Sequence, residues 1–311
     1  MAVVPAPGFS PLTISDITSN GSDLNSDFKN AITNVIVTRT MNSASTLIIQ
    51  LTDPHRSLLT QPGLLGQGSL VEIPDGFGNY LQFAFRRLSK ASDQLEFTFE
   101  SRVINDLRNT INIVGTSDIT DVGTFVKSIC DSKGIPFVGP INNPYIQPTL
   151  FAGSSGTTTY PNEDAWASMF RIASALGWRC WESAGTIFFG PDEYWYNQLY
   201  EFSNPPVNSY YQHGVPDLAE FTENIQLMDT DWDVGSAFGD MTITCMSHFW
   251  EYNPGEVINI TGMGPASGGW LVSGMQRNFV NPVGTITATM PMPAYQTLNP
   301  PLLPIVGGRV L

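Results

Sequence analysis

Positively charged residues are scarce in this chain. Its 311 residues include 14 Lys and Arg but 28 Asp and Glu, so the formal net charge at pH 7 is −14. Charged residues of both signs make up 14% of the sequence, against roughly 25% in an average soluble domain. Proteins that grip nucleic acid neutralise its phosphates with Lys and Arg. The composition therefore argues against a protein that holds nucleic acid tightly.

The shortage is most pronounced between Arg179 and Arg277, where there is no Lys or Arg at all. This interval holds 13 acidic residues, which account for nearly all of the net charge. A wall of carboxylates would let DNA slide past without holding it. Alternatively, the acids only keep an outer face soluble. The sequence leaves both interpretations open.

The sequence also lacks the features of disulfide-rich, zinc-binding and membrane proteins. Its three cysteines, Cys130, Cys180 and Cys245, are far apart, and none belongs to a CxxC or Cys/His cluster. We expect reduced, buried thiols, which suit assembly in a cytoplasm. No stretch of about 18 apolar residues is present, so we expect no membrane insertion by this chain.

What the chain has instead is a strand-rich first third. The segments with strand-like composition are 34–40, 45–53, 69–75, 79–88 and 93–103. In the last of them, Leu95, Phe97 and Phe99 alternate with polar residues, which indicates a half-buried strand with one wet face. This run of short strands predicts a small β-barrel or sandwich over residues 33–112.

The middle of the chain, residues 113–212, has helical periodicity as well. Val122, Phe125, Val126 and Ile129 share one face of a helix that Gly134 would end. A second helix would begin after the N-cap residue Asn162 and end at Gly177. Each helix is followed by an apolar strand. The middle region is therefore predicted to be α+β.

The all-β pattern returns over residues 213–290. Four strand candidates follow one another at short spacing: 240–249, 255–262, 270–279 and 284–291. The two ends of the chain, residues 1–32 and 291–311, are rich in proline and polar residues and lack the periodicity of packed elements. We expect both ends to be extended arms that reach neighbouring subunits or other proteins.

Glycines crowd together at Gly262, Gly264, Gly268 and Gly269, directly after a strand candidate. A dinucleotide-binding loop or a P-loop would need a helix to follow. Here the next segment, WLVSGMQRNF, has strand composition instead. The glycines are therefore predicted to lie in a hairpin loop.

The segment DTDWDVGSAFGD spaces four acids like the ligands of a calcium loop: Asp229, Asp231, Asp233 and Asp240. Its glycine falls one position late, however, and its last ligand is not Glu. A solvated acidic loop that projects from a barrel rim is the preferred interpretation, and a calcium site is the alternative. No metal or cofactor is predicted.

Aromatic residues and carboxylates cluster at 193–202, 209–213 and 248–252, as they do in glycan-binding clefts. A glycosidase needs two convergent carboxylates, and convergence cannot be read from a sequence. Aromatic packing at domain junctions or interfaces is the commoner reason for such clusters. Because no GxSxG or HExxH motif occurs, we expect no enzymatic activity. A glycan-binding or glycan-cleaving β-rich protein remains the alternative.

The order of the segments resembles that of the tail-tip, or baseplate, hub proteins of long-tailed bacteriophages. VTRTMNSASTLIIQLTDPHRSLL and LEFTFESRVINDLRN resemble the family's first domain, and SMFRIASALGWRCWESAGTIFFGP resembles its middle unit. YNPGEVINITGMGPASGGWLVSGMQRNF resembles its closing barrel. The resemblance covers roughly residues 33–290, and it is closest to minor tail proteins of phages that infect actinobacteria.

The resemblance implies a mainly β, α+β fold with two tube-like antiparallel β-barrel domains separated by an α+β insert. It also implies a homotrimer whose six barrels adapt a sixfold tail tube to a threefold tip. The implied partners are the tail tube and distal tail proteins, the tape measure protein and other tail-tip proteins. Genomic DNA would pass through without specific binding, and the four acids from Asp229 to Asp240 would face that channel. The protein would be assembled in the host cytoplasm and reside at the virion tail tip.

Overall fold

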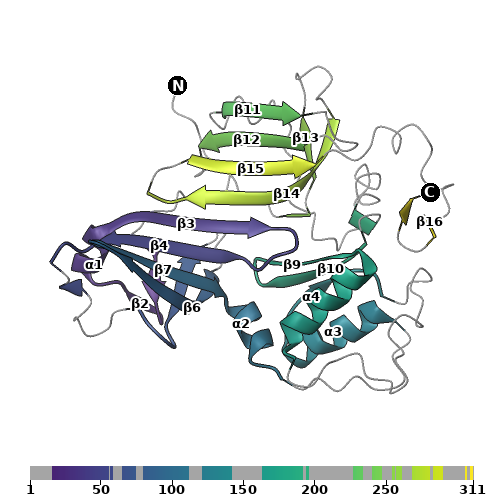
Figure 1. The fold of residues 1–311 in the computed structure, drawn as a ribbon, viewed down its shortest axis with the longest axis horizontal. Coiled ribbons are helices and arrows are strands. Elements are labelled where there is room, and N and C mark those ends of the chain that lie inside the picture. Colours follow the sequence, from purple (N-terminus) through teal and green to yellow (C-terminus); the bar gives the residue numbers. More distant parts are fainter. Residues whose placement is uncertain are drawn as a thin grey trace. The chain divides into compact units, whose positions relative to one another are not determined.

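The structure is a computed structural model, and the chain divides into two compact units (Figure 1). The sheet unit comprises Met1–Thr40, Ala44–Arg102 and Gly214–Met290, and the insert unit comprises Met41–Ser43, Val103–His213 and Pro291–Leu311. Within them the structure describes residues 16–55, 57–58, 65–74, 80–111, 121–141, 163–191, 194–195, 227–233, 240–246, 254–255, 257–260, 268–280, 283–289, 305–306 and 309–310.

The sheet unit is built on one antiparallel sheet. Its strands are β1 (Thr18–Ser19), β2 (Ser22–Asp23), β3 (Ile32–Thr40), β4 (Thr46–Thr52), β5 (Leu70–Pro74), β6 (Tyr80–Ala91), β7 (Gln94–Ser101), β11 (Leu227–Asp233), β12 (Asp240–Met246), β13 (Val257–Ile260), β14 (Gly268–Asn278) and β15 (Val283–Thr289). They are ordered β11-β12-β15-β14-β3-β4-β7-β6-β5-β1-β2, and β13 pairs with β14. The mainly β, antiparallel fold class is therefore confirmed.

Alternation along the strands builds the core of this sheet. On β4, Leu47, Ile49 and Leu51 are fully buried while the residues between them are partly exposed. Phe97 and Phe99 on β7 are buried in the same way, as the sequence pattern predicts. Neighbouring strands contribute their own alternate residues to the same apolar cluster. Each strand thus buries one face and leaves the other wet.

The two β-rich segments do not form separate closed barrels in the described part of the chain. Strand β14 from the C-terminal segment pairs with β3 from the N-terminal one, from Gly274 opposite Thr40 to Asn278 opposite Ile36. No pairing between described strands closes this sheet on itself. The reason is that β3 and β14 are long strands, and the unpaired N–H and C=O groups at the edge of one bond to those of the other. The predicted boundaries of the two tube-like domains stay a prediction.

Residues 16–32 are not an extended arm. They form two short strands and helix α1 (Ser26–Ala31), which Asn25 caps by accepting a hydrogen bond from the Asp27 backbone N–H. Ile17, Leu24 and Phe28 are buried in the core of the sheet. These scattered apolar residues anchor a segment too short to show periodicity. Residues 1–15 of the predicted arm lie outside the described residues.

The glycine-rich loop joins two paired strands. β13 and β14 are antiparallel, with Ile260 opposite Gly268 and Asn259 opposite Gly269. This pairing confirms the predicted hairpin and leaves no helix to receive a phosphate. The loop residues 261–267 lie outside the described residues.

The insert unit packs helices on a small sheet. Helices α3 (Val122–Ser132) and α4 (Ala165–Leu176) accompany strands β8 (Phe137–Val138), β9 (Arg179–Ser183) and β10 (Thr186–Gly190), ordered β8-β10-β9. Helix α2 (Arg102–Arg108) starts at the last residue of the sheet unit. Two strands of two residues each, β16 (Ile305–Val306) and β17 (Arg309–Val310), pair within the predicted C-terminal arm. The other residues of that arm lie outside the described ones. The predicted helix–strand pairs are confirmed.

The start of α4 differs from the prediction. Its N-cap is Asp164, whose side chain accepts a hydrogen bond from the Ala167 backbone N–H at 2.7 Å. The proposed N-cap Asn162 is therefore wrong, because a carboxylate closer to the helix takes that role. The predicted stop at Gly177 is confirmed, since this residue adopts the left-handed conformation with φ 68°.

Candidate functional site

The wet side of the sheet unit is lined mostly by polar residues. Residues directly opposite each other on antiparallel strands lie on the same face. One row of such partners crosses six strands from β12 to β7: Thr244, Thr285, Gln276, Thr38, Thr46 and Glu100. A second row runs through Thr242, Thr287, Gly274 and Thr40. We call this side of β12, β15, β14, β3, β4 and β7 the polar face.

Side-chain hydrogen bonds cross the polar face. The Asn278 amide donates to Asn34 Oδ1 at 2.7 Å, and the Asn34 amide donates to Gln50 Oε1 at 3.2 Å. Gln50 Nε2 then donates to a Glu96 carboxylate oxygen at 2.9 Å. This chain links β14, β3, β4 and β7 without using a cation. It ties the C-terminal segment to the N-terminal segment and holds the polar side chains in place.

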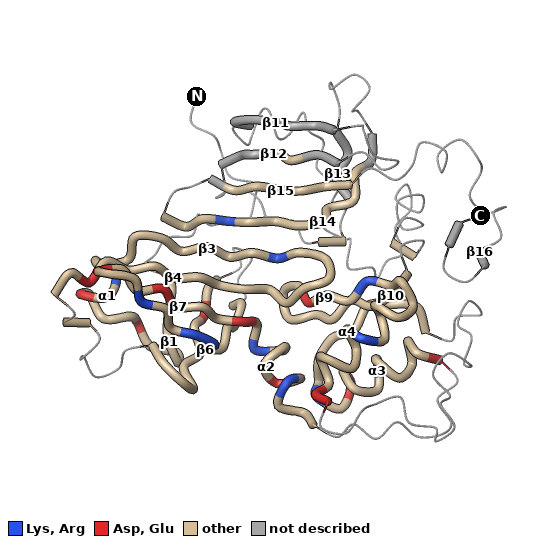
Figure 2. The backbone as a smooth tube through the Cα atoms, viewed as in Figure 1, with Lys and Arg blue, Asp and Glu red and all other residues tan. Residues whose placement is uncertain are grey.

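The six strands of the polar face carry only two basic residues, Arg39 and Arg277. Both occupy positions that alternate to the opposite face, and each is only 3% exposed. Figure 2 shows them as the blue segments on β3 and β14. The Arg277 guanidinium lies 4.7 Å from the centre of the Phe279 ring. None of these six strands therefore offers a Lys or Arg to a phosphate on the polar face. The adjoining strand β6 carries Arg87, opposite Thr98 on the same side, and Arg86, which lies 3.3 Å from the Glu100 carboxylate.

The four predicted site acids lie on strands rather than on a loop. Asp229, Asp231 and Asp233 occupy alternate positions of β11, and Asp240 is the first residue of β12. The expectation of a projecting acidic loop is therefore wrong. The segment LMDTDWD alternates acids with larger or β-branched residues, which favours an extended strand over a loop that wraps an ion.

The acids nevertheless come together, because the strand pairing aligns them with the polar face. Asp229 stands opposite Thr244, Asp231 opposite Thr242, and Asp233 opposite Asp240. The rows of threonines thus end in carboxylate-bearing positions at the β11 edge of the sheet. Among the described residues, no three acidic, His or Cys residues are grouped to hold a metal ion. The sequence signal for this face is the alternation of Asn and Thr with apolar residues in 34–40 and of Thr with apolar residues in 285–289.

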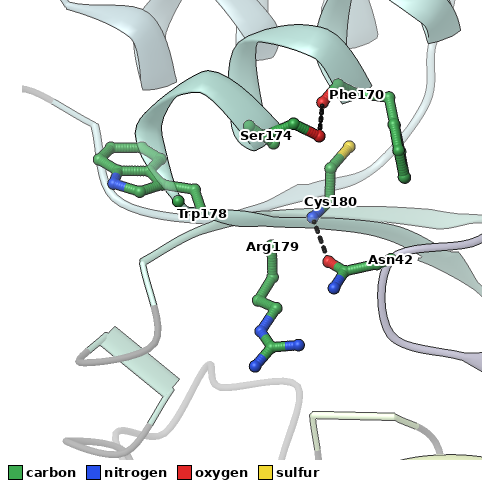
Figure 3. Close-up of a pocket in the computed structure, with 8 residues that line it drawn as sticks. Asn42, Phe170, Ser174, Trp178, Arg179 and Cys180 are labelled. Atoms are coloured by element: carbon green, nitrogen blue, oxygen red, sulfur yellow. Dashed lines mark hydrogen bonds between the residues drawn. The ribbon is translucent and has the colours of Figure 1, made fainter.

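A separate pocket of about 270 Å³ lies in the insert unit (Figure 3). Its lining includes Asn42, Phe170, Ser174, Trp178, Arg179 and Cys180. Asn42 Oδ1 accepts a hydrogen bond from the Cys180 backbone N–H at 3.3 Å, and the Ser174 hydroxyl donates to the Phe170 carbonyl at 2.9 Å. No Asp or Glu is among the lining residues. The pocket therefore lacks the pair of carboxylates that glycoside hydrolysis requires.

The thiols of the insert unit are poor nucleophiles. Burial, and then the nearby Asp131 carboxylate, raise the pKa of the Cys130 thiol to about 12. Complete burial likewise raises the pKa of the Cys180 thiol. A thiol attacks as its thiolate, so neither residue is activated at neutral pH. The expectation of free, buried thiols is confirmed for both.

The described part of the first aromatic cluster is core rather than cleft. Trp195 is fully buried and packs edge-on against Trp181, with ring centres 4.7 Å apart. Its indole N–H donates to the Gly190 carbonyl at 3.3 Å. Residues 196–202, 209–213 and 248–252 lie outside the described residues. In the part of the chain that is described, no helix is long and apolar enough to cross a membrane.

Solved structures of tail proteins share this fold. The tail protein from Neisseria meningitidis MC58 is similar at a TM-score of 0.52 and 14% identity, over 88% of this chain and 95% of that one. The 43 kDa tail protein of prophage MuSo2 from Shewanella oneidensis is similar at 0.52 and 9% identity, over 88% and 97%. No protein-family model matches the chain, and neither does any curated protein sequence.

A third similar structure comes from a secretion machine. This Escherichia coli component of the type VI secretion system is described as structurally similar to the bacteriophage T4 tail proteins gp27 and gp5. Its TM-score is 0.51 at 15% identity, over 88% of this chain and 76% of that one. At such low identities the likeness establishes the fold alone. The chain thus has the fold of phage tail proteins.

Proposed function

We propose that this chain is a structural virion protein, the hub at the tail tip of a long-tailed phage. The single observation that carries the proposal is a continuous antiparallel sheet, six strands of which present a polar face without Lys or Arg, in a chain that has the fold of phage tail proteins. On the sequence resemblance, we propose that this hub is a minor tail protein of a phage that infects actinobacteria. In this role the chain has no enzymatic activity.

The hub is a homotrimer. Each chain supplies two β-rich segments, 33–112 and 213–290, so three chains supply six parts that match a hexameric tail tube. The protein closes the tube and adapts its sixfold symmetry to a threefold tip. Its neighbours are the tail tube, distal tail proteins, the tape measure protein and other tail-tip proteins. The chain is assembled in the host cytoplasm and resides at the virion tail tip.

The polar face lines the DNA channel. A channel must let DNA move without holding it, and each Lys or Arg contact to a phosphate would add attraction. Threonine, asparagine and glutamine interact with water and carry no positive charge that would attract the phosphates of DNA. The edge acids Asp229, Asp231, Asp233 and Asp240 add repulsion, which salt of physiological strength limits to about 8 Å. Genomic DNA therefore passes without specific binding.

Cryo-electron microscopy of the assembled tail tip tests this proposal. We expect a copy number divisible by three and a channel wall that includes the polar face, with the four acids towards the lumen. A copy number not divisible by three would refute the trimer. A reconstruction in which the polar face and all four acids lie on the outside of the ring would refute the channel role.

A further inference from the structure

The pocket of the insert unit has an aromatic wall. Its lining comes from α4, from the turn that follows α4, from the start of β9 and from Asn42 between β3 and β4 (Figure 3). Phe170 on α4 is 37% exposed, although its ring lies 6.0 Å from that of Trp166. A single exposed ring is ordinary on a protein surface. A ring that borders a cavity, however, gives a ligand an apolar surface on which to pack.

Small residues keep the space in this pocket open. Ala173, Ser174 and Gly177 belong to the lining, and a Cβ atom on Gly177 would meet nothing within 4 Å apart from its chain neighbours. Gly177 ends α4 in the left-handed conformation. Trp178, the next residue, donates its backbone N–H to the Ala173 carbonyl at 2.8 Å, and its ring packs edge-on against Phe189 with ring centres 5.3 Å apart. The walls of the pocket are therefore fixed by the fold itself.

The polar groups of the lining are mostly hydrogen-bond donors. Asn42 Oδ1 accepts a backbone N–H of β9 at 3.3 Å, which leaves the amide N–H groups of Asn42 without an acceptor among the described residues. The Trp178 indole N–H has no acceptor there either, and Trp178 is only 8% exposed. The Ser174 hydroxyl donates to the Phe170 carbonyl, so its oxygen remains able to accept. Among the described lining residues, Arg179 supplies the only charged side chain, and it is positive.

These groups suit a small ring that carries acceptor groups. The volume of about 270 Å³ is just below the roughly 300–1,000 Å³ of pockets that hold drug-sized ligands, so the pocket fits one ring rather than several. A pyranose has C–H groups that pack on an aromatic ring, and its hydroxyls both accept from N–H donors and donate to an oxygen such as that of Ser174. A carboxylate on the sugar suits a lining with a guanidinium and no described acid, whereas an amine would meet donors.

We propose that this pocket binds one sugar ring that carries a carboxylate, which is a uronate. The ring packs on Phe170, the Asn42 amide donates to the carboxylate, and the Ser174 oxygen accepts from a sugar hydroxyl. The pocket binds the sugar without cleaving it, because no Asp or Glu is among its described lining residues. This binding site goes beyond the proposed structural role and does not depend on it.

The competing explanation is a gap that only water fills. Small residues at the end of a helix leave spaces, and polar spaces of this kind hold ordered water. Under that explanation the Phe170 ring and the Asn42 amide have no joint role, and the pocket does not distinguish sugars by their charge. The two explanations therefore predict different responses to three sugars that share one ring shape.

NMR spectra of the full chain test the proposal. The chain has seven tryptophans, and Trp178→Phe assigns the indole N–H signal of the one that lines the pocket. D-glucuronate, D-glucose and D-glucosamine are added in turn at about pH 6.5, where the carboxylate and the amine are both charged. Salt at about 0.15 M screens the net charge of −14 on the chain. We expect glucuronate to shift the Trp178 signal saturably with a millimolar dissociation constant, glucose to bind about threefold or more weakly, and glucosamine to give no saturable shift.

Two variants locate the ring and the carboxylate. Phe170→Ala removes the packing surface and should weaken glucuronate and glucose alike, by about fivefold or more. Asn42→Asp keeps the oxygen that accepts the β9 N–H and suits the left-handed backbone at φ 64°, but it replaces the amide donor by a carboxylate oxygen. It should weaken glucuronate about tenfold or more and glucose much less, because like charges repel. Ile141→Ala, at a 45% exposed position outside the lining, is the control and should change neither affinity. Unchanged indole signals of the buried Trp181 and Trp195 show that each variant is folded.

A uronate is available either as a free sugar or as part of a polysaccharide. A short oligomer of glucuronate separates these sources, and either result supports the proposal. Tighter binding than that of the monomer assigns the site to a polymer, whereas equal or weaker binding assigns it to a free or terminal ring.

Three results would overturn the proposal. No saturable shift of the Trp178 signal with any of the sugars would leave only the water-filled gap. Equal affinities for glucuronate, glucose and glucosamine would contradict selection for a carboxylate. Binding that is undiminished in both Phe170→Ala and Asn42→Asp would place the sugar elsewhere on the chain. All three results leave the proposed hub intact, because the copy number and the channel wall of the tail tip test that role separately.

Discussion

The two units of the chain use their strands differently. In the insert unit all five residues of β10 are buried, and so are four of the five residues of β9. In the sheet unit β4 and β7 bury alternate residues and present polar ones between them. A strand buried on both faces serves only to hold a core together, whereas a strand with a wet face also provides a surface. We infer that the insert unit is mainly structural and that the sheet unit supplies the functional surface.

The largest effect is expected in the core of the insert unit. Trp181 is fully buried, stacks on Phe188 with ring centres 5.0 Å apart, and contacts Trp195. Trp181→Ala should lower the free energy of unfolding of this unit by about 3–5 kcal/mol. Urea denaturation monitored by circular dichroism measures the loss. The control, Ile141→Ala, changes a side chain that is 45% exposed and should stay within about 0.5 kcal/mol.

A matched pair of neighbours sharpens the comparison in the sheet unit. Ile49 is fully buried, whereas Ile48 lies on the polar face and is partly exposed. Ile49→Ala should cost about 2–5 kcal/mol of unfolding free energy, and Ile48→Ala should cost less than about 1 kcal/mol because it leaves little or no cavity. Equal losses in urea denaturation would mean that both faces are buried, which would remove the distinction between the two units.

Close backbone packing in the insert unit predicts a smaller loss. A Cβ atom on Gly123 of α3 would overlap the Pro140 carbonyl oxygen, a backbone atom that cannot rotate away. Gly123→Ala should therefore destabilise the insert unit by about 1–3 kcal/mol, although alanine favours helices. Thermal unfolding measures the change. Ser132→Ala, at the exposed end of the same helix, is the control and should be nearly neutral.

Thiol chemistry reports on the insert unit alone. In a Cys245→Ser background, Cys130 and Cys180 should resist a thiol reagent at about pH 8 until the insert unit unfolds, because both are buried. Burial raises the pKa of Cys130 from the ordinary 9.0 to about 12, so the unfolded chain loses this thiol proton first. The stability from the protonated thiol is complete below about pH 9 and declines as the pH rises towards 12. Rapid labelling of the folded chain would contradict the burial.

Local pattern was enough to predict much of the fold. The face of α3 with Phe125 and Ile129 follows from a period of 3.6 residues, and the alternation on β7 follows from a period of two. The pattern also predicted the stop of α4 at Gly177. It failed for residues 16–32, where single apolar residues such as Phe28 find partners far along the chain. Amphipathic periodicity does not encode such partners.

The candidate site was only half visible in the sequence. The sequence singles out the four acids, but their density favours a solvated loop that projects from a barrel rim rather than a pair of strands. Their place at the edge of a polar face depends on the pairing of β11 with β12 and of β14 with β3. The second pairing joins residues such as Gly274 and Thr40, which are far apart in the chain. Nothing in a local window specifies that two segments predicted as separate barrels will share a sheet.

The central claim is that the polar face is the channel wall, and DNA release tests it most directly. Thr38, Gln276 and Thr285 belong to one row of that face, and substituting all three by Lys would add cations to strands that present none there. Each change is on a wet surface and should alter stability by no more than about 0.5 kcal/mol. The control places three Lys in the insert unit: Asn109→Lys, Ser132→Lys and Ala175→Lys.

The measurement is the rate of DNA release from particles that assemble with these variants, followed at low and at raised salt. The account predicts slower release for the polar-face variant at low salt and recovery as salt screens the added charges. The insert-unit control should release DNA at the normal rate in both conditions. Normal release by the polar-face variant at low salt would contradict the account.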